Sequence, residues 1–112
     1  LMKRATFNDI VEETLATSED VLVQKGAEYA DKDVTDDRLH GFVVSASLLG
    51  TSSKEALAGA MVKHTVSVYD MIASGNDFPL EKWDEKITDH INYLILLRAC
   101  VIEEIQQKGT NA

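Results

Sequence analysis

The sequence predicts an all-α fold resembling a four-helix bundle, and three observations indicate this class. Only one proline and six glycines stand among the 112 residues, so turn signals are few. Apolar residues recur at helical spacing over long stretches. Serine and glycine residues mark several expected helix ends. We therefore expect residues 1–112 to form a single all-α domain.

The first helix is expected from Phe7 to Gln24, with Thr6 as its N-cap. Gly26 disfavours its continuation, and the acidic segment 28–37 lacks an apolar period, so we expect a loop there. One face of the helix is apolar and is expected to be buried: it carries Phe7, Val11, Leu15, Ser18 and Leu22.

The second helix is expected from Asp36 to Leu49, with Thr35 as its N-cap. Gly50 is well placed to end it in the left-handed conformation. The residues expected on its buried face are Leu39, Phe42, Val43, Ala46 and Leu49.

The third helix is introduced by a capping box, in which Ser52 is the cap and Glu55 stands three residues later. It is expected to reach Ser74 and to end at Gly75. Its expected buried face comprises Leu57, Met61, His64, Val68, Met71 and Ile72.

The fourth helix is expected from Leu80 to Gln106, because Pro79 suits the start of a helix. One stripe of this helix carries Trp83, Ile87, Ile91, Leu94, Val101 and Ile105. Between Ile91 and Ile102 apolar residues occur on nearly every side, which favours burial all round. We expect this helix to join subunits into a dimer or higher oligomer; the alternative is that the bundle wraps it within one chain.

The chain is acidic, with a formal net charge of −8 and no basic cluster beyond Lys3 and Arg4. This balance disfavours direct binding to a nucleic-acid duplex. It is compatible with a divalent cation, with a basic partner, or with solubility alone.

Cys100, the single cysteine, lies in an apolar run and is expected to be a buried thiol. No signal peptide or membrane-length segment is evident, so the cytoplasm is the expected location.

A line of polar side chains follows one face of the fourth helix. Glu81, Glu85, Asp89 and Asn92 are spaced by helical turns, and the line continues into apolar residues that are expected to be buried. Carboxylates that approach a cleft favour Mg²⁺, which prefers oxygen ligands. The alternative is a solvated helix face without a ligand.

The third helix carries a second polar line, formed by Lys63, Ser67, Asp70 and Ser74. We expect either a surface network of ion pairs with the fourth helix or a contact between Lys63 and a phosphate. His64 lies at the edge of the apolar face, where a packed core histidine is the favoured interpretation. The segment that starts at Asp31 begins like the calcium-binding loop of an EF-hand, but the pattern then fails. The sixth position is Asp36, where the loop needs glycine, and the twelfth is Phe42, where it needs glutamate, so an EF-hand is excluded.

Four segments in a fixed order carry a family resemblance: Lys25-Gly26-x-x-Tyr29, Arg38-Leu39-x-x-Phe42, Lys63-His64 with Asp70, and the run from Glu85 to Leu94. The chain resembles small helical proteins that are common in bacteriophages. These include the nucleotide-modification-associated domains, which are distantly similar to the MazG-like all-α nucleotide pyrophosphatases. The resemblance covers Lys25 to Glu103.

The resemblance implies that the protein binds or processes a nucleotide with Mg²⁺. In the pyrophosphatases a Glu-Glu-x-x-Glu motif and a later Glu-x-x-Asp motif hold Mg²⁺ on a nucleoside triphosphate. The second motif maps to Glu85 and Asp89, which stand one residue farther apart here. The first motif is not met, because the third helix offers Lys63 and His64 where acids are expected and only Asp70 remains.

The resemblance assigns expected roles to individual residues. Glu85 and Asp89 would hold Mg²⁺, Asn92 would orient them, and Lys63 would contact phosphate. Phosphate contacts or base stacking would come from Lys25, Tyr29 and Arg38. Catalysis as a pyrophosphatase-like hydrolase is left open, and a phage-encoded protein would act in the host cytoplasm. The alternative is a non-enzymatic, acidic helical oligomer that binds a host or phage protein as an inhibitor or adaptor.

Overall fold

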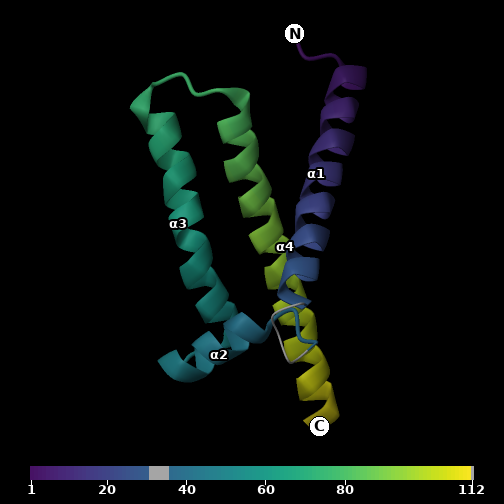
Figure 1. Ribbon diagram of the computed structural model, residues 1–112, viewed down its shortest axis with the longest axis vertical. Helices are drawn as coiled ribbons and strands as arrows, with labels where there is room; N and C mark the ends of the chain where they lie inside the picture. The colour runs from purple at the N-terminus through teal and green to yellow at the C-terminus, as the bar shows by residue number, and fades with distance from the viewer. Residues whose placement is uncertain (31–35, 112) are drawn as a thin grey trace. The chain divides into compact units, whose positions relative to one another are not determined.

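A computed structural model describes residues 1–30 and 36–111, without the side chains of residues 27–30, 110 and 111. The described residues form four α-helices and no strand, which confirms the all-α class. The helices are α1 (Arg4–Ala30), α2 (His40–Leu49), α3 (Ser53–Ser74) and α4 (Leu80–Asn111) (Figure 1). The chain divides into two units, Leu1–Asp36 and Asp37–Ala112, and we describe each by itself.

The first unit consists of α1, which is longer than its sequence pattern predicts. The backbone N–H of Phe7 donates to the carbonyl of Lys3 at 2.9 Å, so the helix begins at Arg4 and Thr6 lies inside it. The prediction of Thr6 as N-cap is therefore wrong. The helix also continues through Gly26 to Ala30, because one glycine costs only about 1 kcal/mol in a long helix. The predicted cap Thr35 lies outside the described residues.

The apolar face predicted for α1 is largely exposed. Phe7, Val11 and Leu15 are each more than a third accessible to solvent. Of the same predicted face, Ser18 is buried and Leu22 is half-buried. Among the described residues of this unit α1 is the one helix, so the unit itself offers no second helix to cover the exposed part of the face.

Helix α2 begins at His40, later than the predicted Asp36. The carboxylate of Asp37 accepts the backbone N–H of Leu39 at 2.9 Å, and the carbonyl of Asp37 accepts that of His40 at 3.1 Å. These bonds organise a turn ahead of the helix and delay its start. The predicted end is confirmed, because Gly50 adopts φ 69° and its N–H donates to the carbonyl of Ala46.

Helix α3 has the predicted bounds. The hydroxyl of Ser52 accepts the backbone N–H of Glu55 at 3.2 Å, and the Glu55 carboxylate accepts the N–H of Ser52 at 3.4 Å. The capping box is thus confirmed, as is Gly75, which ends the helix with φ 68°. Helix α4 follows Pro79 directly and extends past Gln106 to Asn111.

In the second unit α3 and α4 run antiparallel and side by side, and α2 packs against α3 near the start of α3 (Figure 1). Leu57 is completely buried, and the thiol of Cys100 is buried beside it, as its apolar surroundings predicted. Burial raises the pKa of this thiol, and the charges of Glu103 and Asp37 act in the same direction. The core of the unit comprises Leu39, Leu57 and Cys100 with Phe42, Tyr93, Leu96, Leu97 and Ala99 packed around them.

The apolar faces of the second unit are buried only in part. Leu39, Ala46, Leu57 and Met71 are buried as predicted. By contrast, Leu49 and Ile72 are exposed, and so are three residues of the α4 stripe: Ile87, Leu94 and Ile105. Within the second unit, α2 and α3 therefore leave part of the second half of α4 uncovered. None of the described helices combines the length and the hydropathy needed to cross a membrane.

Candidate functional site

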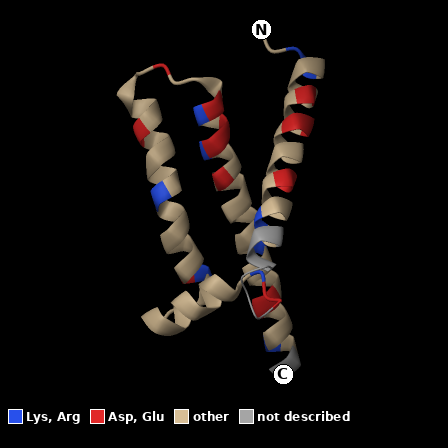
Figure 2. Cartoon of the chain, viewed as in Figure 1, with Lys and Arg blue, Asp and Glu red and all other residues tan. Residues whose placement is uncertain are grey.

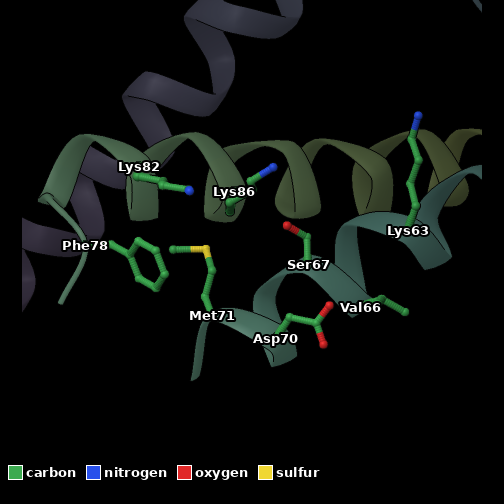
Figure 3. A pocket seen from close by; sticks show the side chains of 8 residues that line it. All are labelled: Lys63, Val66, Ser67, Asp70, Met71, Phe78, Lys82 and Lys86. Carbon is green, nitrogen blue, oxygen red and sulfur yellow. The ribbon is translucent and has the colours of Figure 1, made fainter. Parts of the chain in front are cut away.

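An open groove of about 360 Å³ lies between the last turns of α3 and the first turns of α4 (Figure 3). The capping box and Gly75 fix where α3 begins and turns back, and Pro79 starts α4 beside it. The groove is lined by Lys63, Val66, Ser67, Asp70 and Met71 from α3, by Phe78 from the connecting loop, and by Lys82 and Lys86 from α4.

The groove has an aromatic end and a cationic end. Phe78 lies at one end with Met71 beside it, and Lys63 lies at the other (Figure 3). On α4, Lys82 lies over Phe78 and Met71, and Lys86, one helical turn farther along, lies opposite Ser67 of α3 (Figure 3). One wall of the groove therefore suits a flat apolar group, and the rest suits an anion.

The charge of the groove is opposite to that of the chain. Lys63, Lys82 and Lys86 surround it with Asp70 as the only acid among the lining residues, although the chain carries a net charge of −8. In the described part of the chain none of these three lysines has a carboxylate within 4.0 Å. Elsewhere lysines do find acids, as where Lys54 meets Glu104 at 3.0 Å. Figure 2 shows acidic and basic residues next to one another along the first half of α4.

Phe78 is held from two sides. The edge of Trp83 meets it at 6.1 Å between ring centroids, with an angle of 80° between the ring planes. The ammonium of Lys82 lies 4.7 Å from the ring centroid, which is within cation–π distance. Both contacts lie at the aromatic end of the groove.

Next to the groove, polar contacts join α3 to α4 around His64. Its ring packs against Tyr93 at 4.8 Å between centroids, and its Nδ1 atom lies 3.8 Å from the Asp89 carboxylate. Burial lowers the pKa of His64; Asp89 opposes this effect, and Lys63 and Lys86 reinforce it. The imidazole is therefore neutral at neutral pH. His64 is a packed histidine, as its position in the sequence favours.

The predicted acidic line is not part of the groove. Glu81 and Glu85 are exposed, and Asp89 lies against His64. Asn92 is 5% exposed, and its side-chain amide has no hydrogen-bond partner among the described residues, so no such bond joins it to Glu85 or Asp89. The described residues contain no group of three or more histidine, cysteine or acidic side chains arranged to hold a metal ion. The magnesium assignment to Glu85 and Asp89 stays a prediction.

The remaining predicted residues divide between the two units. Lys63 and Asp70 share the groove, as their common helix face predicted. Lys25 is an exposed residue of α1, and the side chain of Tyr29 lies outside the described residues. Arg38 is exposed in the turn before α2 and does not line the groove. Their assignment to phosphate contact or base stacking stays a prediction.

The sequence reasoning missed Phe78, Lys82 and Lys86 as groove residues. Part of the signal is present, because Lys82 and Lys86 stand four residues apart and so share one face of α4, while Phe78 precedes the helix in the connecting loop. The neighbouring acids Glu81, Glu85 and Asp89 lie on the adjacent face of α4, and the prediction was based on that face. Only the packing of α3 against α4 distinguishes which of the two faces meets Lys63 and Asp70.

Comparisons with known protein families, proteins and structures found no match for this chain. No protein-family model matches the chain, and no curated protein and no solved structure is significantly similar to it.

Proposed function

We propose that this protein binds a nucleotide in the groove between α3 and α4. The observation that carries the proposal is the set of three lysines around one groove, none with a carboxylate partner among the described residues of an acid-rich chain. Unpaired ammonium groups in such a place repel one another, and a bound anion removes this repulsion. Phosphate oxygens form charge-assisted hydrogen bonds with lysine, which makes a phosphorylated ligand the natural occupant.

A nucleotide suits the groove better than a simple anion does. Phe78 and Met71 offer apolar surface at one end, where a base can stack on the aromatic ring. Lys82 lies close to this ring, with its ammonium 4.7 Å from the centroid, and Lys86, Ser67 and Lys63 follow farther along the groove (Figure 3). The family resemblance, which implies nucleotide binding with Lys63 on phosphate, agrees with this placement.

A magnesium ion would bind outside the groove. Glu85 and Asp89 are oxygen donors of the kind that Mg²⁺ accepts, and they stand near Lys86 on the same helix. Because they do not line the groove, a metal held by them would lie beside the lysines and would act on a part of the nucleotide that extends past them. Hydrolysis of a nucleoside triphosphate would require this metal.

The test is isothermal titration calorimetry with nucleoside mono-, di- and triphosphates, with and without Mg²⁺. We expect binding to the native protein, and a loss of about tenfold or more in affinity for Lys63→Gln or Lys86→Gln, because each removes a charged hydrogen-bond donor. Arg98→Gln is the matched control: it removes one positive charge from α4 at an exposed position that does not line the groove.

Two outcomes would contradict the proposal. One is the absence of heat with every nucleotide, in the presence and in the absence of Mg²⁺. The other is an equal loss of affinity in Arg98→Gln and Lys86→Gln, which would mean that only the overall charge matters. Product analysis after incubation with triphosphates and Mg²⁺, for the native protein and for Asp89→Asn, tests the hydrolase form separately.

A second function is favoured by a different observation. The α4 residues Leu94, Ile95 and Ile105 are 50%, 45% and 63% exposed, which leaves an apolar stripe on this helix in contact with solvent. We propose as the alternative that the protein is a non-enzymatic helical oligomer, which assembles through α4 and presents its acidic surface to a host or phage protein.

A further inference from the structure

We propose that the groove recognises a nucleoside diphosphate group without a divalent cation, with the base on Phe78 and with Lys82 moving from the ring to a phosphate. This inference rests on the proposed nucleotide site and specifies its ligand class and its metal requirement. In kinases, ATPases and polymerases, Mg²⁺ is bound together with the phosphates of the nucleotide. In this groove the lysine side chains would supply the positive charge that Mg²⁺ supplies in those sites.

The charge of the groove argues against a metal inside it. The lining residues include three lysines and a single acid, Asp70, so they supply an excess of positive charge. Mg²⁺ needs several oxygen ligands, and one acid and one hydroxyl cannot provide them against three nearby ammonium groups. The same excess neutralises an anion that carries more than one negative charge.

The geometry favours two linked phosphates over one. Lys82 and Lys86 stand one turn apart on α4, and Lys63 and Ser67 stand one turn apart on α3. Within each pair the Cβ atoms lie about 5–6 Å apart. Two such pairs on facing helices bracket a length of groove and match an elongated anion (Figure 3).

Phe78 and Lys82 link base recognition to phosphate recognition. In this structure the Lys82 ammonium lies 4.7 Å from the Phe78 centroid, while Trp83 holds the ring by its edge. A cation–π contact at an exposed position is weaker than a charge-assisted hydrogen bond to phosphate. A diphosphate therefore draws Lys82 off the ring, and the ring face that it leaves is available to the base.

The experiment is calorimetric titration of ADP, AMP and inorganic pyrophosphate into the full chain, once with Mg²⁺ and once with EDTA. The affinity for ADP is expected to differ by less than about threefold between the two conditions, and AMP is expected to bind about tenfold more weakly. Trp83 is the only tryptophan and touches Phe78, so its fluorescence reports occupancy of the aromatic end independently.

Two variants separate the ends of the groove. Phe78→Leu is expected to lower the affinity for ADP about fivefold or more and to leave the affinity for pyrophosphate unchanged. Phe78→Tyr keeps an aromatic ring and is expected to bind ADP as the native protein does. Lys86→Gln is expected to weaken both ligands by about tenfold, and Arg98→Gln neither. Circular dichroism at the titration temperature establishes that each variant is folded.

The outcomes distinguish this inference from the proposed function. Binding of ADP that requires Mg²⁺, or equal weakening of ADP and pyrophosphate in a folded Phe78→Leu protein, would overturn the inference and leave nucleotide binding intact. Equal affinity for AMP and ADP would overturn the diphosphate assignment alone. If no phosphorylated ligand binds under any condition, both the inference and the proposed function fail.

Discussion

Leu57 is a fully buried side chain in the core of the second unit. Its side chain is completely buried, in contact with the core that α2, α3 and α4 share. Because the surrounding helices cannot close fully over a lost side chain, removal of its methyl groups leaves a cavity as well as a lost transfer free energy.

Leu57→Ala is therefore expected to lower the free energy of unfolding by about 2–5 kcal/mol, measured by urea denaturation followed by circular dichroism. Leu48→Ala is the control, because Leu48 is 82% exposed on α2, and we expect a change within about 0.5 kcal/mol. Similar losses for the two variants would mean that the described core is wrong.

Cys100 gives a second prediction at the residue scale. The side chain is buried, and burial raises the pKa of the thiol, so the reactive thiolate is scarce in the folded state. We expect a thiol reagent at pH 8 to label the unfolded chain at once and the folded chain only as it opens, as followed by mass spectrometry. Immediate labelling of the native protein would contradict the burial of this residue.

Two glycines show how the same substitution has opposite effects in different elements. An added Cβ meets no atom within 4 Å at either Gly59 or Gly75, so packing does not distinguish them. Gly59 lies inside α3, where alanine is the better helix former. Gly75 ends α3 with φ 68°, a conformation that side chains disfavour.

We expect Gly59→Ala to raise the free energy of unfolding by about 0.5–1 kcal/mol. Gly75→Ala is expected to lower it by about 1–2 kcal/mol, because alanine resists the left-handed conformation. Thermal and urea denaturation of the two variants provide the measurement. A stabilised Gly75→Ala protein would show that α3 does not end as described.

At the level of elements, the sequence predicted local features well and packing poorly. The Ser52–Glu55 capping box and the end at Gly75 were readable because both depend on neighbouring residues alone. The start of α2 was missed because the Asp37 carboxylate organises a turn with Leu39, which competes with the helix. The groove was half-predicted: Lys63 and Asp70 lie on one helix, whereas their meeting with Lys82 and Lys86 depends on how two helices face each other.

At the scale of the whole molecule, the exposed stripe of α4 leads to a prediction about assembly. If α4 joins subunits, the native protein sediments at micromolar concentration as a species heavier than the 12.4 kDa chain. Ile105→Glu is then expected to shift it towards the monomer, because a charge in an apolar contact is costly. Leu48→Glu serves as the control on another exposed apolar residue. A native monomer in analytical ultracentrifugation would reject assembly through α4.

The central claim concerns where a nucleotide binds, and a titration of the ¹⁵N-labelled protein with ADP followed by amide NMR shifts tests it most directly. We expect the amides of Ser67, Asp70, Lys82 and Lys86 and the indole N–H of Trp83 to shift together with one saturation curve. The Lys54–Glu104 end of the α3–α4 pair lies outside the groove and is expected to stay unchanged. Shifts centred elsewhere, or no shifts at millimolar ADP, would contradict the claim.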